Sequence, residues 1–338
     1  MTPWWSWRKV AELWQRFFHE PVDTLPCDLL RIGYALILLV YCLAAWPYVI
    51  TWYGAGGVYP LDVSRQLIDP DCLTLFQWLP NTNMTAVIGM GLLTLHSLLL
   101  LVGVASTWQA IGAYVWLVSF NHRNLLILDA EDSVLRILSF LMMLMPLGNY
   151  LSWDSWRRHG RLWGGEPTCR PCWALRLWQL EMCLIFLGCA YSKAQGDYWL
   201  DGRALFYASR LDDLFDRFPS PAFLWETMPL LKWMGWMVIL LELSAPILIW
   251  FRETRTWTLV VLILFHLAID YTMNLFLFHW IMIAGWLTFV SADAWRAAVA
   301  RVAGWADAGK LTPNGWPSGT QPPPAGHRMS GLPDRLGG

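Results

Sequence analysis

Long apolar stretches, separated by short polar segments, run through most of the chain. Several approach the roughly 20 residues that an α-helix needs to cross a bilayer. The pattern predicts about eight transmembrane helices, at residues 29–50, 84–104, 108–128, 133–151, 173–192, 229–250, 256–275 and 276–290. Almost no polar loop separates the last two, which also fits a re-entrant or broken helix. The expected fold is an all-α, polytopic membrane helix bundle.

The two ends of the chain lack this pattern. Residues 1–26 predict an amphipathic helix in the membrane interface, because aromatic side chains that suit headgroup depth stand among basic ones that can face lipid phosphates and water: Trp4, Trp5, Trp7, Arg8, Lys9, Trp14, Arg16, Phe17 and Phe18. Residues 304–338 are rich in Gly and Pro and predict a disordered tail. The transmembrane bundle is therefore expected to occupy residues 27–303.

Composition agrees with a membrane protein, since 56% of the residues are hydrophobic and only 14% are charged. The 25 tryptophans are expected chiefly as a belt at the two membrane interfaces. A net charge of −1 provides no basic excess for nucleic acid, and no nucleic-acid-binding motif is present. Membrane lipid is therefore the expected partner.

Lysine and arginine near the ends of membrane helices favour the cytoplasmic side. With the N-terminus inside, the predicted cytoplasmic segments carry Arg8, Lys9, Arg16, Arg157, Arg158, Arg161, Arg170, Arg252, Arg255, Arg296 and Arg301. The opposite side carries Arg65, Arg123, Lys193, Arg203, Arg210 and Arg217, together with many aspartates. We expect both termini in the cytoplasm and Lys193 at the extracytoplasmic face.

The stretch from Gly188 to Gly202, GCAYSKAQGDYWLDG, ends an apolar segment on Lys193 and passes at once into aromatic and acidic residues. A lysine at such a place can be partly desolvated and act as a base in its neutral form. The alternative is snorkelling, in which the side-chain stem lies at the bilayer edge and the ammonium reaches water. The spacing alone leaves both interpretations open.

Other polar side chains inside the predicted spans are costly in lipid and are expected to face the bundle interior or a wet cavity. In the fifth span, Arg176, Gln179 and Lys193 fall within one arc of the helix. The third and sixth spans contribute Asn121, His122 and Glu242. Most of these groups are expected in the outer half of the membrane, with Arg176 and Glu242 deeper.

The seventh span carries His266, Asp270 and Asn274 at every fourth residue, a spacing at which His266 and Asp270 can hydrogen-bond. The same spacing allows two metal ligands on one helix face, but no HxxxH or HExxH accompanies it, so no metal is expected. Cys169 and Cys172 form an isolated CxxC, which favours a pair of free thiols over a zinc or redox centre.

Four sequence runs resemble the HTTM family, the "horizontally transferred transmembrane domain" shared with vitamin K-dependent gamma-glutamyl carboxylase. They are NHRNLLILDAEDSVLR, RLWQLEMCLIFLGCAYSKAQGDYWLDGRAL, ELSAP and FHLAIDYTMNLFLFHWIMIAG, and the resemblance covers about residues 31–290. It includes an RxxQ motif at Arg176, a lysine followed by W-xx-G at Trp199, and an FH motif at His266.

The resemblance implies functions for particular residues. In the carboxylase, the lysine matched by Lys193 is regarded as the base that deprotonates reduced vitamin K, which implies a reduced vitamin K-type quinone as cofactor. The histidine of an Asn-His pair, here Asn121 and His122, is implicated near that site, and His266 matches the histidine of the late FH motif. We expect His122 to donate a hydrogen bond to an oxyanion, and His266 to be supported by Asp270.

Together these observations favour a gamma-carboxylase-like enzyme of the bacterial cytoplasmic (inner) membrane, which modifies a secreted peptide. Lys193, His122 and His266 are the expected catalytic residues. The substrate or cofactor cavity is expected to include Asn121, Arg176, Gln179, Trp199, Glu242, Asp270 and Asn274. One alternative is a non-catalytic maturation factor that binds a lipid or quinone, or docks a partner subunit. A transporter is a further alternative, against which stands the lack of a repeat between the two halves.

Overall fold

The computed structural model describes residues 7–67, 72–160, 162–163, 168–211, 214–215 and 217–302. Trp4, Trp5 and the predicted tail at 304–338 lie outside the described residues. The chain divides into two compact units, Met1–Ala292 and Asp293–Gly338. All the predicted site residues lie in the first unit, and the predicted boundary at residue 303 stays a prediction.

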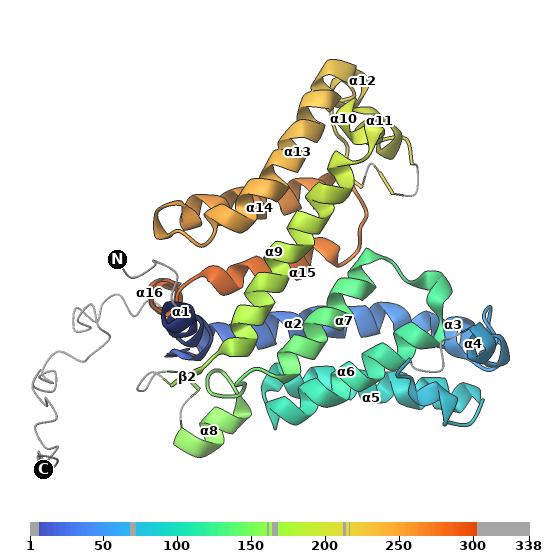
Figure 1. Ribbon diagram of the computed structural model, residues 1–338. Helices are drawn as coiled ribbons and strands as arrows, with labels where there is room; N and C mark the ends of the chain where they lie inside the picture. Colours follow the sequence, from blue (N-terminus) through green and yellow to red (C-terminus); the bar gives the residue numbers. More distant parts are fainter. Residues whose placement is uncertain are drawn as a thin grey trace, which may run out of the picture. The chain divides into compact units, whose positions relative to one another are not determined.

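Helices make up nearly all the regular structure, which confirms the expected all-α fold (Figure 1). The longer helices are α1 (Trp7–His19), α2 (Leu25–Ala45), α5 (Asn83–Val102), α6 (Ser106–Arg123), α7 (Ala130–Met143), α9 (Trp173–Ala194), α13 (Met228–Leu248), α14 (Arg252–Thr272), α15 (Phe278–Trp286) and α16 (Ala292–Val302). Two short strands, β1 (Pro21–Asp23) and β2 (Cys169–Pro171), pair in antiparallel orientation with Asp23 opposite Cys169.

Short helices occupy the connections. They are α3 (Val49–Tyr53), α4 (Leu61–Leu67), α8 (Trp153–His159), α10 (Asp197–Leu200), α11 (Arg203–Ala208) and α12 (Phe223–Glu226), with 3-10 turns η1 (Trp46–Tyr48), η2 (Leu75–Gln77), η3 (Leu125–Ile127) and η4 (Leu287–Phe289). Local sequence explains where several elements begin. Asp129 and Asp132 form a capping box at the start of α7, and the Ser152 hydroxyl accepts from Ser155 N at the start of α8.

Five stretches are long and apolar enough to cross a bilayer: Leu25–Tyr53, which joins α2, η1 and α3, and the helices α5, α9, α13 and α14. This is a multi-pass membrane protein. The predicted third, fourth and eighth spans correspond to α6, α7 and α15, which do not reach the same length and apolarity. The count of eight spans stays a prediction.

The chain breaks between α14 and α15, where a re-entrant or broken helix was one expectation. Phe276 has φ +39°, a left-handed conformation that interrupts helical geometry. The nine residues of α15 extend only about 14 Å, less than half of the roughly 30 Å hydrocarbon core. This geometry fits a broken helix better than two complete spans.

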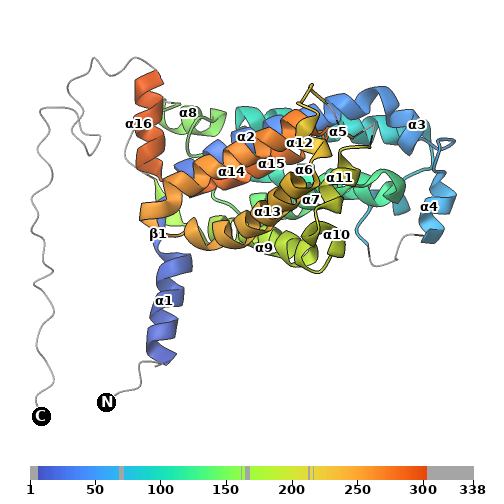
Figure 2. The same cartoon turned by 90° about the horizontal axis from the view of Figure 1, so that it is seen from above.

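Helix packing in the first unit follows two series of neighbours. In one, α2 packs on α5, α5 on α6 and α6 on α7; in the other, α9 packs on α13 and α14 packs on α15. The short α15 also contacts α2, α7 and α9, so it joins the two series. Figure 2 shows α9 and α13 side by side in a second view.

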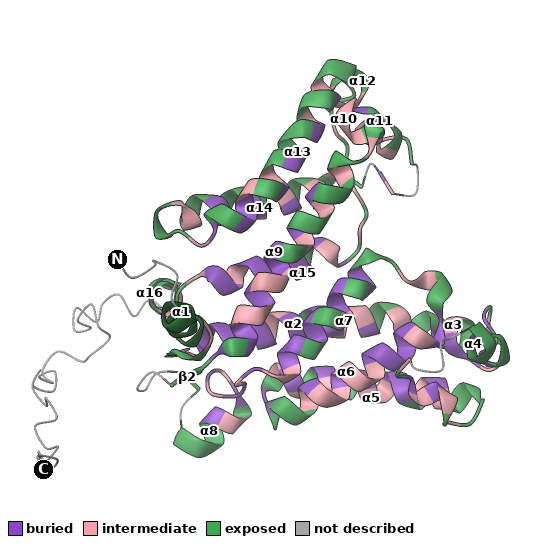
Figure 3. Cartoon of the chain, in the orientation of Figure 1, coloured by how far each residue is buried: buried purple, intermediate pink, exposed green. Residues whose placement is uncertain are grey.

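The helices differ in how many of their residues are buried (Figure 3). More than half of the residues of α2 and α7 are buried, whereas only six of 21 are buried in α13 and four of 21 in α14. Large apolar side chains such as Trp233 and Trp257 are about three-quarters exposed, at 70% and 73%. Since an apolar side chain gains nothing from facing water, we assign these surfaces to lipid contact.

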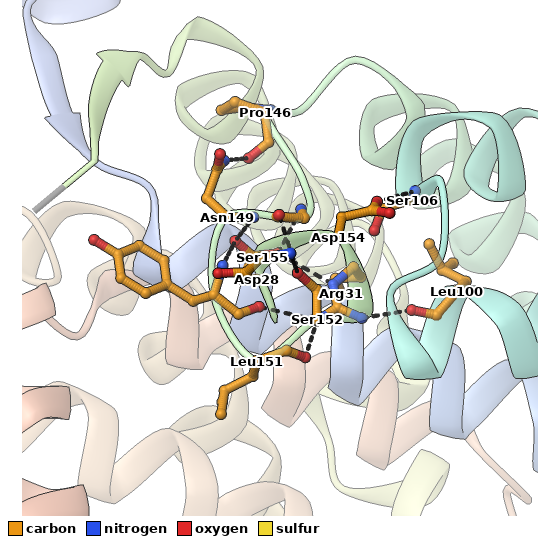
Figure 4. A network of polar contacts seen from close by, with 12 residues as sticks. Asp28, Arg31, Leu100, Ser106, Pro146, Asn149, Leu151, Ser152, Asp154 and Ser155 are labelled. Atoms are coloured by element: carbon orange, nitrogen blue, oxygen red, sulfur yellow. Dashed lines mark hydrogen bonds and ion pairs between the residues drawn. The ribbon is translucent and has the colours of Figure 1, made fainter. Parts of the chain in front are cut away.

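From its position near the start of the first predicted span, Arg31 is expected to be a snorkelling anchor rather than a partner for a lipid phosphate, and the structure contradicts this expectation. Its side chain is fully buried and pairs with the equally buried Asp28 at 3.1 Å (Figure 4). The guanidinium donates to the carbonyls of Leu100, Leu101, Tyr150 and Leu151 at 2.5, 2.9, 3.3 and 2.7 Å. The anchor interpretation was wrong because the last carbonyls of α5 offer this guanidinium acceptors inside the protein.

The Asp28 carboxylate completes the network by accepting three backbone N–H groups. Gly148, Asn149 and Tyr150 donate to it at 2.7, 2.9 and 2.9 Å. Because a carboxylate and a guanidinium together satisfy seven backbone groups, α2 holds the end of α5 and the segment after α7 in place. The network fixes the fold at the predicted cytoplasmic end.

Candidate functional site at the outer end of α9

Lys193 lies in the last turn of α9, where its ammonium contacts Glu242 of α13 at 2.6 Å. The Lys193 side chain is 18% exposed and that of Glu242 only 6%. Side chains on a helix lean toward its N-terminus, so a lysine at the C-terminal end of α9 turns back along the bundle. The ammonium therefore meets a buried carboxylate, which the snorkelling interpretation does not predict.

The segment after α9 brings an aromatic ring to the same ammonium. The Lys193 carbonyl accepts from Gly196 N, and α10 starts directly afterwards at Asp197. This tight connection returns Trp199 over Lys193, with Nζ 5.0 Å from the ring centroid. Such a distance allows a cation–π interaction. The structure thus brings together three residues that the sequence predicts in one site, Lys193, Glu242 and Trp199.

The turn that follows α10 is held by Asp201 and Arg203, outside the membrane-spanning helices. The Arg203 side chain and its backbone N–H both donate to the Asp201 carboxylate. These bonds, the side-chain one first, lower the pKa of Asp201 below its usual range. Gly202 between them has φ +88°, and a Cβ there would lie 2.7 Å from Lys232 N. The backbone of this turn therefore packs directly against the backbone of α13.

His266 of α14 has a partner that the sequence analysis did not identify. Its Nδ1 lies 3.3 Å from Nδ1 of His279, the second residue of α15. The two residues are 2% and 0% exposed. Each also has a buried Nε2 with no hydrogen-bond partner in the described part of the chain.

The histidine pair and the lysine pair both lie against one face of α9. Phe186 packs on the His266 ring with centroids 5.8 Å apart, and on Trp286 at 4.8 Å. Phe186 precedes Lys193 by seven residues, which is close to two full helical turns and about 10 Å along the axis. The histidines therefore lie about two turns deeper than Lys193 along the same face of α9.

Asp270 does not support His266 as expected. Its carboxylate pairs with Arg217 at 2.6 Å, with side chains 14% and 35% exposed. The backbone N–H of Asn274 donates to the Leu214 carbonyl at 2.7 Å. The expected His266–Asp270 bond was wrong because the segment before α13 supplies a closer cation for Asp270, while α15 supplies a closer ring for His266.

Asn121 and His122 lie at the end of α6 and make other contacts. Asn121 donates to Asp132 at 2.9 Å, and His122 Nδ1 lies 2.7 Å from the Leu73 carbonyl. Nη1 of Arg136 approaches His122 Nε2 at 3.2 Å, so both ring nitrogens have partners. No hydrogen bond among the described residues joins His122 to Lys193 or His266. A role as oxyanion donor would require one of the present contacts to break, and it stays a prediction.

Arg176 and Gln179 lie at the opposite end of α9 from Lys193. Arg176 donates to Gln179 at 2.9 Å, and Gln179 donates to the Thr288 carbonyl at 2.8 Å. The 17 residues from Arg176 to Lys193 correspond to about 25 Å of helix. One helix arc thus carries two separate polar clusters, which angular spacing alone could not distinguish.

The CxxC cysteines differ in their surroundings, since Cys169 is exposed and Cys172 is buried. The Cys172 thiol donates to the Val22 carbonyl at 3.9 Å, and its interaction with the Cys27 thiol lowers the pKa of Cys172 below its usual range. All seven cysteines are free thiols. Among the residues that the structure describes, no three His, Cys, Asp or Glu side chains are grouped closely enough to hold a metal ion.

His279 is the functional candidate that the sequence analysis missed. It stands alone in the apolar run FLFHWIMIAG, and that isolation was the available signal. Its partner is 13 residues earlier, on the other side of the chain break between α14 and α15. Helical spacing reveals neighbours within one helix only, so it could not pair the two.

Comparison with known proteins gives one result. The sequence model of the HTTM domain matches residues 62–295, which is more than half of the chain and includes Lys193, Glu242, His266 and His279. No curated protein and no solved structure matches the chain.

Proposed function

Because the chain belongs to the HTTM domain family, we propose that it is a membrane-embedded enzyme of the vitamin K-dependent gamma-carboxylase type, with Lys193 as the base. The HTTM domain is a membrane domain found in that carboxylase. The observation that carries the proposal is the 2.6 Å contact between Lys193 Nζ and the buried Glu242 carboxylate.

The contact explains how a lysine can act as a base inside a membrane. An ion pair in apolar surroundings gains Coulomb energy but loses the hydration of both charges. Transfer of one proton from Nζ to Glu242 gives a neutral amine and a neutral carboxylic acid, whose burial costs much less free energy than the burial of two charges. Lys193 Nζ then carries the lone pair that accepts a proton, while Glu242 holds the proton that it received.

The residues around Lys193 fit a reduced quinone. Trp199 provides an aromatic face next to Nζ, and Glu242 Oε2 is buried with no hydrogen-bond partner in the described part of the chain. An aromatic face and a free acceptor suit a flat ring that bears hydroxyl groups. Lys193, Glu242 and Trp199 are the residues that would hold the quinone. When bound, a reduced quinone supplies an acidic hydroxyl and the electrons for reaction with oxygen.

The proposal extends to substrate and location. A secreted peptide is the proposed substrate, and the bacterial inner membrane is the proposed location, with both termini in the cytoplasm. Lys193 would then face the extracytoplasmic side, where a peptide that has crossed the membrane can reach it.

A second candidate is a non-catalytic maturation or quinone-binding factor, or one that docks a partner subunit. One observation favours it: no histidine among the described residues contacts Lys193, so the lysine pair has no second acid or base beside it. In this function, Lys193 and Glu242 only join α9 to α13.

Analysis of bound lipids tests whether a quinone binds near Lys193. Wild-type protein, Lys193→Ala and the control Lys232→Ala would be extracted in mild detergent, and the lipids that co-purify would be measured by mass spectrometry. The proposal expects a quinone enriched in wild type and in Lys232→Ala, and reduced at least several-fold in Lys193→Ala. Equal amounts of quinone in all three proteins would show that Lys193 does not contribute to quinone binding. The absence of quinone from all three would contradict quinone binding.

A further inference from the structure

We infer that Arg176 of α9 and Arg255 of α14 form a binding site for the phosphate group of an anionic phospholipid. The site lies at the end of α9 opposite Lys193, so the inference goes beyond the proposed function and does not rest on it. Each arginine is the fourth residue of a helix that is long and apolar enough to cross a bilayer. Both therefore stand about 5 Å inside the end of a membrane span, close to the depth of the lipid phosphates.

The Arg176 guanidinium is held in a fixed position. Its Nη1 donates to Gln179 Oε1 at 2.9 Å, and Gln179 in turn donates to the Thr288 carbonyl at 2.8 Å. Its Cζ lies 5.3 Å from the centroid of the Phe17 ring of α1. Nε and Nη2 of Arg176 have no acceptor among the described residues. A fixed guanidinium with free N–H groups is prepared for a phosphate, whose oxygens can accept two parallel bonds from one arginine.

Arg255 is fixed by the backbone at the end of α13. Its Nε donates to the Ile249 carbonyl at 3.1 Å and its Nη2 to the Trp250 carbonyl at 3.2 Å, while Nη1 has no acceptor in the described part of the chain. The Trp250 ring packs on Phe17, with ring centroids 5.5 Å apart. Phe17 thus contacts both Arg176 and the residue to which Arg255 is bonded, so α1, α9 and the start of α14 meet at one place.

The positive charges of the two arginines are not balanced by the part of the chain that the structure describes. The Arg255 guanidinium is close enough to repel that of Arg176, and Glu20 supplies the opposing negative charge. Glu20 is itself paired with Arg16 at 3.4 Å, and no described carboxylate lies within 4 Å of Arg176 or Arg255. Both arginines are half-buried, so water screens their repulsion only in part. A phosphate bonded to both would replace this repulsion with two attractions.

The surroundings favour a lipid over free phosphate as the source of that group. Trp173 stands three residues before Arg176 and Trp257 two residues after Arg255, with exposed fractions of 38% and 73%. Tryptophan side chains prefer the membrane interface, where acyl chains and headgroups meet. Free phosphate has no acyl chains to contact these rings. On the predicted topology this end of the bundle faces the cytoplasmic leaflet, which carries anionic lipids.

Native mass spectrometry of the whole protein in detergent tests the site, with phosphatidylglycerol and phosphatidylcholine added as separate probes. Wild type should retain several-fold more phosphatidylglycerol than phosphatidylcholine. Arg176→Gln and Arg255→Gln should each lower phosphatidylglycerol binding several-fold. The control Arg157→Gln should keep it, since Arg157 is exposed on α8 at the same predicted side of the membrane. Equal binding of the two lipids by wild type would overturn the preference for an anionic lipid without recourse to any variant.

Thermal unfolding of the same proteins distinguishes a lipid from free phosphate. Phosphatidylglycerol should raise the unfolding midpoint of wild type and of Arg157→Gln, and inorganic phosphate should raise it much less. Arg176→Lys keeps the charge but loses the planar fork, so its phosphatidylglycerol binding should lie between those of wild type and Arg176→Gln. Equal stabilisation by inorganic phosphate would overturn the lipid assignment. Unchanged phosphatidylglycerol binding in folded Arg176→Gln and Arg255→Gln proteins would overturn the site.

Discussion

Lys193 and Glu242 form a close ion pair between two membrane helices, and their coupling energy is measurable. We expect a double-mutant cycle with Lys193→Met and Glu242→Gln to give a coupling of about 1.5 kcal/mol or more, because each single change leaves the other group buried without its partner. Reversible unfolding in mixed micelles would measure it. The exposed pair Asp201 and Arg203 serves as the control and should give a clearly smaller coupling energy, because solvent screens both charges. Similar couplings in both cycles would contradict a special environment at Lys193.

Asp28 and Arg31 are predicted to contribute strongly to stability. Arg31→Met leaves the Asp28 carboxylate buried without its cation and frees four carbonyl acceptors, so we expect the free energy of unfolding to fall by about 3–5 kcal/mol. Thermal or chemical unfolding of the purified variant would show this loss. Arg16→Ala, which breaks an exposed pair with Glu20, should change stability by less than about 1 kcal/mol. A stable Arg31→Met protein would mean that these carbonyls find other donors.

From the sequence, individual polar residues could be predicted better than their partners. Lys193 and Glu242 are conspicuous because each is a charged side chain in or at the end of an apolar run, and Trp199 belongs to the W-xx-G motif of the family resemblance. His266 and Asp270 stand on one helix at a spacing of four, which predicts that they pair. The partner of His266 comes from another helix, and only tertiary packing brings them together.

At the scale of elements, the turn that carries Trp199 depends on Gly202. Gly202→Ala forces a side chain into a left-handed conformation and against the Lys232 backbone, so we expect a loss of about 2 kcal/mol or more in stability. Tryptophan fluorescence would also report movement of Trp199 away from Lys193.

Gly188→Ala provides the matched control for Gly202→Ala. Gly188 lies within α9, is exposed, and has no atom within 4 Å of the position that a Cβ would take. Alanine is favoured over glycine inside a helix, so this variant should be at least as stable as wild type. Equal destabilisation by both substitutions would contradict the close approach of Gly202 to α13.

Element lengths explain which helices the sequence could identify. The stretches α5, α9, α13 and α14 are 20 to 22 residues long and strongly apolar, so hydropathy finds them. In contrast, α7 has 14 residues and α15 has nine, and the predicted spans ran past their ends into the adjoining turns. The strands β1 and β2, with three residues each, leave no periodic signal.

For the whole molecule, the prediction concerns topology. The distribution of arginine and lysine predicts that both termini of the chain face the cytoplasm and that the segment from α10 to α12 faces the extracytoplasmic side. Green fluorescent protein fused after Val302 should fluoresce, and alkaline phosphatase fused after Ser209 should be active in a bacterial host. The reverse pattern would place Lys193 at the cytoplasmic face and remove access for a secreted substrate.

Hydroquinone turnover by the reconstituted protein tests the central claim, that Lys193 acts as a base, most directly. Wild type, Lys193→Ala, Lys193→Arg and the control Lys232→Ala would be supplied with oxygen and a reduced vitamin K-type quinone, and the epoxide formed would be measured by chromatography. We predict turnover in wild type and in Lys232→Ala, and a rate at least about 100-fold lower in both Lys193 variants, as expected for loss of a general base. Full activity in Lys193→Ala, or no turnover in wild type, would contradict the account.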